Sequence, residues 1–433
     1  MYLIYSLLLT IAFVVLLPRF LLDTISNGKY ADGFWQRLGF LPEFKHNGHP
    51  LIWLHCVSVG ETNAARPLIS QLKVNFPNHR LVVSTTTKTG QELAKAVFSH
   101  QADSVFYFPF DWKFSVRRFL DHFEPDVILL METEIWPRFI REAKRSEAKI
   151  AIVNGRLSAK SFKRYSFARR FVRSVLSNID LALMQGENDA RGFESLGVPA
   201  DKIRITGNVK FDLEIDDNEK SLTENFRDRF GFSYDKPLIV AASTHSPEEK
   251  WIIEGFQRVY HLMEGKPRLL IAPRHPQRFD DVAAILGGAG FSVVRRSTKP
   301  SIDDKKSEVV LLDSIGELRA VYPLAEIVFV GGSLMPHGGQ SILEPAAAGK
   351  AIITGPYTHN FDSVVREFLD HKALIQLPEA VRESLVVERI YETFAMLLRE
   401  PIERDSLGSN AFALMRMSRG ATSSTIDALK RIL

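Results

Sequence analysis

The sequence of 433 residues has a single cysteine, Cys56, and can therefore form neither an internal disulfide nor a site of several thiolates. A lone thiol is typical of a protein that stays in a reducing compartment. The Asp-x-Asp, HExxH, paired CxxC and Walker A patterns are also absent, as are repeats and low-complexity tracts. These absences exclude a disulfide scaffold and a repeat array, and they leave no recognisable set of ligands for a metal ion.

Net charge is low: 55 Lys and Arg against 51 Asp and Glu give a formal value of +4. This excess is too small for a nucleic-acid-binding protein, but it suits an anionic substrate or an acidic membrane surface. With 45% apolar and 24% charged residues, the chain has the composition of a packed globular protein, and its length predicts two domains rather than one.

Charge is missing altogether from residues 1–17, and the apolar stretch that begins there is long enough to cross about 30 Å of hydrocarbon. No basic residue precedes it, whereas Arg19, Lys29 and Arg37 follow it, so the positive-inside rule keeps the remaining chain in the cytoplasm. We therefore predict a membrane-anchor helix over residues 1–24. The alternative is a first helix that is buried in the globular body.

Beyond this segment, short apolar runs alternate with amphipathic stretches, which predicts an α/β protein with parallel sheets and crossover helices. We expect two Rossmann-like domains, residues 25–212 and 213–405, facing across a cleft, and a C-terminal helix at 406–433. The charged stretch 212–235 is expected to be a linker and a solvated helix. Ligands of such sheets bind at the carboxyl ends of the strands. The expected strands are 51–57, 80–84, 127–131, 149–153, 181–185, 203–206, 238–242, 268–272, 292–294, 309–312, 327–330 and 351–354.

Acidic residues follow two expected strands of the first domain. Gly60 permits a tight turn after the first strand, and Glu61 then lies near the start of a helix that runs from Asn63. A carboxylate held there is suited to act as a general base, although it could equally be an N-terminal capping residue. Glu132 and Glu134 follow the buried strand 127–131 directly, where packing needs no acids. Glu132 is expected to pair with Glu61, and Glu134 could be structural.

Basic and glycine-rich segments follow strands of the second domain. Arg274 comes directly after strand 268–272, where a guanidinium suits a phosphate or carboxylate. Residues 329–345 predict a strand, a glycine-rich loop and a helix that begins near Ser341, an arrangement whose backbone amides can hold an anion. Glu344 would accept hydrogen bonds from ribose hydroxyls. Five histidines, expected on loops and to act in hydrogen bonding rather than metal binding, are His55, His245, His275, His337 and His359.

A basic stretch with interleaved aromatic residues covers 160–173 (KSFKRYSFARRFVR) and contains no acid. It predicts a helix that lies on an anionic membrane surface. The alternative is an exposed basic helix whose aromatic side chains enter the core.

These motifs, in this order, resemble the 3-deoxy-D-manno-octulosonic acid (Kdo) transferases of lipopolysaccharide biosynthesis. The resemblance covers about residues 37–361, and the matching segments are WLHCVSVGET, STTTKTG, FPFD, METEIWPR, NGRLS, GNVKFD, AASTH, APRHPQRF, SIGEL, FVGGSLMPHGGQSILEP and GPYTHNF. The resemblance implies a glycosyltransferase-B fold, CMP-Kdo as donor and a lipid A precursor as acceptor, at the cytoplasmic face of the bacterial inner membrane. It implies no cofactor and no metal.

Carried over residue by residue, the resemblance makes Glu61 the catalytic base and Glu132 a second active-site carboxylate. One departure is that Gln340-Ser341 stands where the family usually has His-Asn. Serine is shorter but keeps a donor and an acceptor. The implied nucleotide-binding positions are Pro273, Arg274, Gly316, Glu317, Leu318, Ser341 and Glu344. Basic residues near strand ends or beside the membrane that could bind the acceptor are Arg37, Lys88, Arg156 and Lys210.

Two other functions remain open from the sequence. The same fold serves UDP-sugar transferases and a nucleotide-sugar epimerase, and a stabilising effect of CMP or of UDP on the melting temperature would separate them. The chain could also be an inactive, membrane-tethered binding protein, which a Kdo-transfer assay would reveal.

Overall fold

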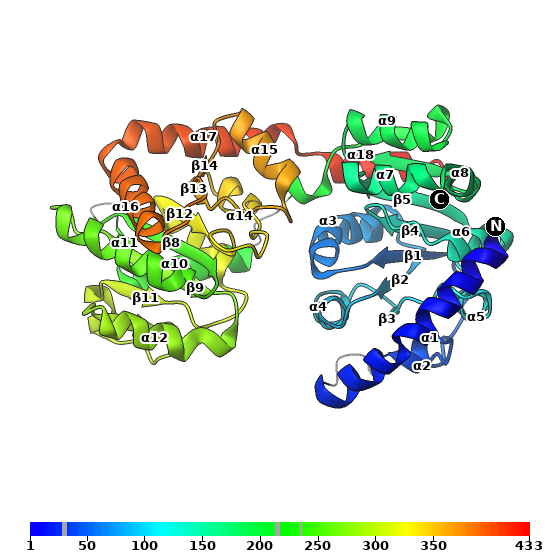
Figure 1. Cartoon of the computed structure of the whole chain (residues 1–433), viewed down its shortest axis with the longest axis horizontal. Coiled ribbons are helices and arrows are strands. Elements are labelled where there is room, and N and C mark those ends of the chain that lie inside the picture. The colour runs from blue at the N-terminus through cyan, green and yellow to red at the C-terminus, as the bar shows by residue number, and fades with distance from the viewer. Residues whose placement is uncertain (28–32, 213–216, 234–235) are drawn as a thin grey trace. The chain divides into compact units, whose positions relative to one another are not determined.

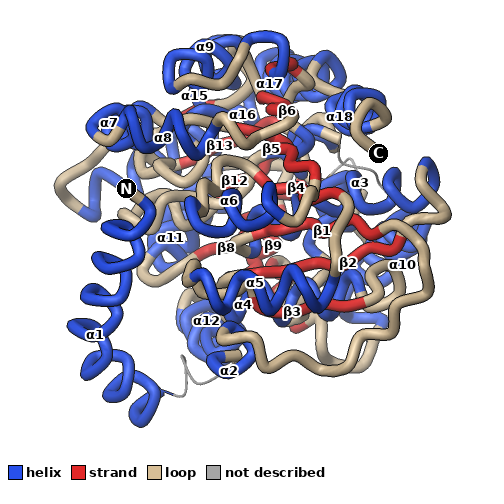
Figure 2. The backbone as a smooth tube through the Cα atoms, turned by 90° about the vertical axis from the view of Figure 1, so that its right-hand side faces the viewer, coloured by secondary structure: helices blue, strands red, loops and turns tan. Residues whose placement is uncertain are grey.

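The computed structural model describes residues 1–27, 33–212, 217–233 and 236–433. The chain forms two compact units, Met1–Asp212 with Ser418–Leu433, and Leu213–Met417. Each unit contains one parallel sheet, and Figure 2 colours the strands of the chain red and its helices blue. The two-sheet α/β architecture expected from the sequence is therefore confirmed.

The sheet of the first unit has the strand order β3-β2-β1-β4-β5-β6-β7, and all neighbouring strands are parallel. This is the Rossmann order, in which the direction of winding reverses between β1 and β4. The strands are β1 (Leu51–Cys56), β2 (Arg80–Thr85), β3 (Ser104–Tyr107), β4 (Val127–Met131), β5 (Lys149–Gly155), β6 (Leu181–Met184) and β7 (Ile203–Ile205). The helices are α1 (Tyr2–Asn27), α2 (Phe34–Arg37), α3 (Val59–Asn75), α4 (Lys88–Phe98), α5 (Lys113–Phe123), α6 (Pro137–Arg145), α7 (Ala159–Phe167), α8 (Arg169–Leu176), α9 (Glu187–Leu196) and α18 (Ala421–Leu429).

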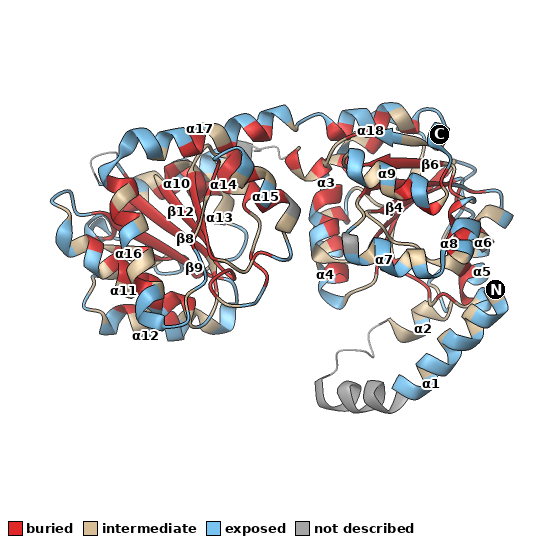
Figure 3. Ribbon diagram, turned by 45° about the horizontal axis from the view of Figure 1, so that its top comes forward, coloured by how far each residue is buried: buried red, intermediate tan, exposed pale blue. Residues whose placement is uncertain are grey.

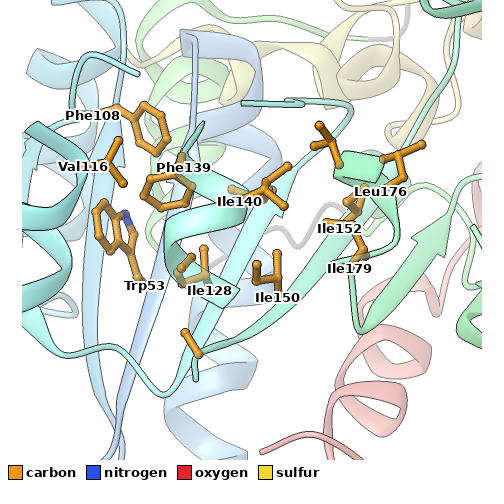
Figure 4. Close-up of a cluster of buried hydrophobic side chains, with 14 of the residues drawn as sticks. Trp53, Phe108, Val116, Ile128, Phe139, Ile140, Ile150, Ile152, Leu176 and Ile179 are labelled. Atoms are coloured by element: carbon orange, nitrogen blue, oxygen red, sulfur yellow. The ribbon is translucent and has the colours of Figure 1, made fainter. Parts of the chain in front are cut away.

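Both faces of this sheet are buried, which explains why its central strands are continuously apolar rather than alternating. In β1, Trp53 enters one core while Ile52 and Leu54 enter the other, because successive side chains point to opposite faces. Figure 4 shows the first of these cores, where Trp53 and Phe139 pack together with their ring centres 5.1 Å apart. The packed cores on both faces of the sheet hold the carboxyl ends of the strands in place.

The sheet of the second unit has the order β10-β11-β9-β8-β12-β13-β14, again entirely parallel. Its strands are β8 (Leu238–Thr244), β9 (Arg268–Pro273), β10 (Val293–Arg295), β11 (Val309–Leu311), β12 (Ile327–Val330), β13 (Ala351–Thr354) and β14 (Ile375–Gln376). Its helices are α10 (Asp217–Phe230), α11 (Glu248–Leu262), α12 (Phe279–Gly288), α13 (Leu318–Val321), α14 (Leu343–Ala347), α15 (Asp362–Asp370), α16 (Glu383–Arg399) and α17 (Pro401–Met417). Short 3-10 helices of the chain are Ala200–Lys202, Val209–Phe211, Pro276–Arg278, Ile302–Lys306 and Tyr322–Leu324.

Two strands, β3 and β14, were not predicted from the sequence. Both lie at an edge of their sheet and pair with one neighbour only, β3 with β2 and β14 with β13. They are four and two residues long. An edge strand of this length contributes too few apolar residues to stand out from a loop.

The expected C-terminal helix at 406–433 is wrong in its extent. Two helices, α17 and α18, cover the region, and Gly420, at φ 99°, caps the start of α18 in a conformation that favours glycine. Helix α18 belongs to the first unit, where Ile426 and Leu429 enter the core (Figure 1). The Asp212 carboxylate accepts hydrogen bonds from the backbone N–H groups of Gly420 and Thr422 at 2.7 and 2.5 Å.

The charged stretch 212–235 contains α10, which is not the solvated helix that we expected. Phe226 and Phe230 are fully buried, and the Thr223 hydroxyl donates to the carbonyl of Ala320. The helix packs against α13 and is part of the second unit. Helix α10 has few apolar residues, but they lie on one side, so its composition did not reveal that it packs against the rest of the second unit. The remainder of the expected linker, residues 213–216 and 234–235, lies outside the described residues.

The first turns of helix α1 pack on the first unit, and most of the residues of this helix whose burial is described are exposed (Figure 3). The Tyr5 hydroxyl donates to Asp111 at 2.7 Å, and the Tyr2 ring meets Phe171 edge to face. The exposed apolar side chains are Met1, Leu3, Ile4, Leu7, Leu8, Ile11, Val14, Val15 and Leu16. Over the part of the chain that the structure describes, no helix combines the length and the apolar character required to cross a bilayer.

The basic stretch 160–173 forms two helices, α7 and α8, rather than one. Its aromatic residues divide between two environments: Tyr165 and Phe171 pack against the core, while Phe162 is partly exposed and Phe167 is 98% exposed. The alternative in which the aromatic side chains enter the core therefore holds for Tyr165 and Phe171, and binding of the stretch to a membrane surface stays a prediction.

Candidate active site

Glu61 lies at the carboxyl end of β1, in the first turn of α3. The helix begins at Val59, four residues earlier than expected, so Gly60 is helical and forms no tight turn. One carboxylate oxygen of Glu61 accepts from the Val57 backbone N–H at 2.7 Å, and the other lies 3.4 Å from the Ser58 hydroxyl. Glu61 thus caps the start of α3, as the structural alternative requires, and is also 7% exposed at a strand end.

Glu132 follows β4, the strand that pairs with β1 in parallel. Its backbone is in the left-handed region at φ 53°, and its N–H donates to the Val153 carbonyl. The Lys210 ammonium lies 2.5 Å from a Glu132 carboxylate oxygen. Glu61 and Glu132 therefore occupy the two sides of the point where the winding of the sheet reverses, the usual ligand site of such folds.

The electrostatic environment raises the proton affinity of two acids, Glu61 and Glu134. Burial first, and then the charge of Glu132, raise the pKa of Glu61 to about 8, although the Val57 N–H and Lys210 act in the opposite direction. Burial and Glu132 likewise raise the pKa of Glu134 to about 7, against the influence of Trp136 and Arg164. Two carboxyl groups that take up protons near neutral pH are suited to proton transfer.

The four expected acceptor-binding residues differ in their surroundings. Lys210 pairs with Glu132, and Arg156 lines a cavity of about 380 Å³ together with Glu132 and Glu134. Lys88 is the exposed first residue of α4. Arg37 instead donates to the backbone carbonyls of Thr86 and Phe108 and lies over the Tyr107 ring, contacts that hold the protein together.

His55 does not lie on a loop as expected. It is a buried residue of β1 that stacks on Phe108, with ring centres 3.8 Å apart, and burial lowers its pKa to about 3. It is a neutral core residue, which apolar neighbours along the strand could have indicated.

In the second unit, three histidines that are far apart in the sequence lie together. The His245 ring is 5.1 Å from His275 and 4.9 Å from His337, measured between ring centres. They follow β8, β9 and β12, which are neighbours in the sheet. Burial, followed by the other two histidines, lowers the pKa of His245 to about 4. Pro273 ends β9, and Arg274 beside the cluster is exposed.

The glycine-rich loop after β12 is held by Glu248, a residue that the sequence analysis did not single out. The fully buried Glu248 carboxylate accepts from the backbone N–H groups of His245, Gly332, Ser333 and Leu334 at 2.7–2.9 Å. A Cβ atom at Gly331 would come within 2.7 Å of the Thr244 backbone, so the loop requires glycine there. The available signal was a pair of acids, Glu248 and Glu249, directly after a strand.

The other expected nucleotide-binding residues lie in two loops. Gly316 adopts φ 87°, and Leu318 begins α13. Burial favours protonation of Glu317, but hydrogen bonds from Arg296 and Ser314 outweigh it and hold its pKa below the usual value.

Helix α14 begins at Leu343 rather than near Ser341 and has five residues. The Ser341 hydroxyl accepts from the Leu343 N–H at 3.4 Å. Glu344 lies 4.0 Å from Arg319. Among the residues that the structure describes, no three His, Cys, Asp or Glu side chains are grouped to hold a metal ion.

Comparison with known proteins decides the family. The family model described as 3-deoxy-D-manno-octulosonic-acid transferase (kdotransferase) matches residues 32–213. The chain is 34% identical to the 3-deoxy-D-manno-octulosonic acid transferase of Haemophilus influenzae over 99% of its own length and 98% of the relative's. The chain belongs to this family. The transferase of Bordetella pertussis is 32% identical over 88% of the chain and 86% of the relative. The protein is thus a glycosyltransferase.

Solved structures show how far the fold extends beyond the family. The UDP-GlcNAc 2-epimerase of Neisseria meningitidis, bound to UDP-GlcNAc, covers 88% of the chain and is itself covered completely, with a TM-score of 0.59 at 14% identity. At this identity the likeness concerns the fold alone. The C-terminal CMP-Kdo binding domain of WaaA from Acinetobacter baumannii is 32% identical over 46% of the chain and 98% of its own length, with a TM-score of 0.41.

We expect Glu248→Ala to loosen the glycine-rich loop, because four backbone donors lose their acceptor and each buried unpaired donor costs about 1–3 kcal/mol. Hydrogen exchange at Gly332, Ser333 and Leu334 should accelerate at least about tenfold, and Glu248→Gln, which keeps one acceptor oxygen, should have an intermediate effect. Lys250→Ala, an exposed change on the same helix, is the control. Unchanged exchange at these three amides in Glu248→Ala would show that the carboxylate does not hold the loop.

Proposed function

We propose that the protein transfers Kdo from CMP-Kdo to a lipid A precursor of the lipid IVA type, with inversion at the anomeric carbon and without a metal ion. Membership of the Kdo transferase family supports the sugar that is transferred. The observation that carries the mechanism is Glu61, a buried carboxyl group with a pKa near 8 beside Glu132 at the strand ends.

Glu61 acts as the general base of this reaction. Its carboxylate takes the proton of an acceptor hydroxyl as the hydroxyl oxygen forms a bond to the anomeric carbon of Kdo, and the bond from that carbon to the CMP phosphate breaks with its electron pair on the phosphate. A base of pKa about 8 binds the proton more tightly than an ordinary carboxylate does. Glu132, paired with Lys210, supplies negative charge that raises this pKa.

The second unit binds the donor. Arg274, exposed at the end of β9, faces the anion with positive charge and hydrogen-bond donors, which is how a site without a cation stabilises a leaving phosphate. Ser341 and Glu344 contact the nucleotide, and Pro273, Gly316, Glu317 and Leu318 shape its surroundings. The neutral His245 donates its Nδ1–H to the Ser243 carbonyl, which leaves its Nε2 able to accept one hydrogen bond there.

The test is mass spectrometry of the product from purified protein, CMP-Kdo and a tetraacylated lipid A precursor, with EDTA present. We expect the acceptor mass to rise by one or more Kdo residues, and Glu61→Gln to give no product while binding CMP with unchanged affinity. Glu92→Gln, an exposed carboxylate of α4, is the matched control and should be fully active. Absence of product from the wild-type protein contradicts the proposed function; loss of product only with EDTA contradicts the metal-free mechanism.

The pH profile provides a separate test of Glu61. Because the base must be ionised, kcat/KM should be high above pH 8 and fall as the pH decreases through about 8. Glu132→Gln removes a negative neighbour and so lowers the pKa of Glu61, which should move the fall of the profile to lower pH even if the maximal rate decreases. Glu92→Gln should leave the midpoint unchanged. A midpoint that does not move in Glu132→Gln would show that the two acids are not coupled.

We further propose that α1 attaches the protein to the cytoplasmic face of the inner membrane, where its acceptor is embedded. Exposed apolar side chains continue along α1, and Trp35, Phe40 and Phe114 of the same unit are also exposed. A surface of this size, with basic residues nearby, favours insertion into an anionic bilayer.

Flotation with vesicles that contain anionic phospholipid tests this attachment. The wild-type chain should float with the vesicles, and the double variant Leu7→Asp/Val14→Asp should stay at the bottom, because charge on the apolar face opposes insertion. Ile302→Asp, which changes an equally exposed apolar residue of the second unit, should float like the wild type. Flotation of the double variant would contradict a role for α1.

A further inference from the structure

A cavity of about 380 Å³ in the first unit extends from Glu132 along the loops after β4 and β5 to the start of α7. Its size is within the range of small-molecule sites and exceeds what one water or ion requires. Thr133 joins the loops after β4 and β5, because its hydroxyl donates to the Arg156 carbonyl and accepts from the Arg156 N–H. The cavity is therefore built by a hydrogen-bonded pair of loops, and the proposed base adjoins it through Glu132.

Donors and acceptors alternate around this cavity. Arg156 and Arg164 supply guanidinium N–H groups, and Glu132 and Glu134 supply carboxylate oxygens. Ser161 adds a hydroxyl, which can do both. Hydroxyl groups of a sugar also donate and accept at once, so a wall of mixed character complements a sugar better than it complements a plain anion.

The net charge of the cavity favours a sugar with one negative group. The Lys210 ammonium already compensates Glu132. Burial and Glu132 raise the pKa of Glu134 to about 7, so at neutral pH it carries less negative charge than an ordinary carboxylate. The two guanidinium groups therefore exceed the uncompensated negative charge. Asp189 lies near Arg156 and offsets part of its charge, whereas the exposed Arg164 lies near Glu134 and Tyr165.

Aromatic side chains complete the lining. Trp136 and Tyr165 both border the cavity, and Tyr165 is fixed by packing against the core and by the Arg164 guanidinium, 5.3 Å from its ring centre. Indole and phenol rings offer flat apolar faces on which the C–H groups of a pyranose can lie.

We infer that this cavity binds a pyranose that bears a phosphate or carboxylate group, as the subsite that orients the acceptor beside Glu61. Arg164 binds the anionic group, and Glu134 and Ser161 bind ring hydroxyls. The inference rests on the proposed function for its role in catalysis, but binding of the sugar itself does not depend on turnover. Arg164, Trp136 and Tyr165 were not among the residues expected from the sequence.

Ligand-detected NMR on the full chain tests the binding. The probes are N-acetylglucosamine 1-phosphate, glucuronic acid, neutral N-acetylglucosamine and inorganic phosphate. We expect the first two to bind, with affinity reduced about tenfold or more by Arg164→Gln and unaffected by Lys163→Gln, an exposed neighbour on the same helix that does not line the cavity. Binding by only one of the two acidic sugars identifies the anionic group. Binding of inorganic phosphate as tight as that of the sugars, or equal binding of the neutral sugar, would overturn the inference.

Kinetics with the lipid acceptor test the role in orientation. Arg164→Gln should raise the acceptor KM about tenfold while kcat and the KM for CMP-Kdo stay within twofold, and Lys163→Gln should match the wild type. An unchanged acceptor KM in Arg164→Gln overturns the inference even if transfer proceeds normally. If the wild-type protein forms no product, the proposed function fails, and the binding experiment still decides the cavity.

Discussion

The parallel pairing of β1 with β4 is the constraint on which the first unit's chemistry depends. The pairing aligns His55 with Leu130, so the two strands end at the same edge and their next residues lie close together. Glu61 lies in the helix after β1 and Glu132 follows β4, and the winding of the sheet reverses between these two strands. Two carboxylates at the ends of buried strands cannot both be well solvated, so one of them binds its proton more tightly. Glu61 does so, because burial and then the charge of Glu132 raise its pKa more than the Val57 N–H and Lys210 lower it.

Glu61 and Glu248 are both buried at helix starts, but their carboxylates accept different numbers of hydrogen bonds. Glu248 accepts from four backbone N–H groups that belong to two loops, so its oxygens have no capacity left for a substrate. Glu61 accepts one close backbone bond and one long contact from Ser58. The same residue type, in the same place of a βα unit, therefore stabilises loops in one case and remains able to take a proton in the other.

Sequence reasoning predicted the central strands and the residues that follow them, because buried parallel strands are continuous apolar runs that end at polar loops. Strands β4, β12 and β13 match their expected bounds. It failed where the signal is not local. The His245, His275 and His337 cluster depends on the order β9-β8-β12, which no short motif encodes. The return of α18 to the first unit depends on side chains from both ends of the chain, such as Leu429 against the α3 region.

The geometry of α14 bears on Gln340 and Ser341, which stand where the family usually has His-Asn. This helix is one turn long and too short to provide a directed dipole, so the loop before it must place its own donors. Ser341 uses its oxygen to accept from the Leu343 N–H, and a hydroxyl that accepts can still donate its hydrogen outward. The Gln340 amide nitrogen lies near Gly332, where a Cβ would be 3.4 Å away. Ser341 thus retains a hydroxyl hydrogen to donate, while the Gln340 side chain lies beside the Gly332 backbone. The glycines of this loop answer to its own packing, because a Cβ at Gly331 would lie 2.7 Å from the Thr244 backbone and one at Gly338 would lie 2.3 Å from the Asn360 side chain.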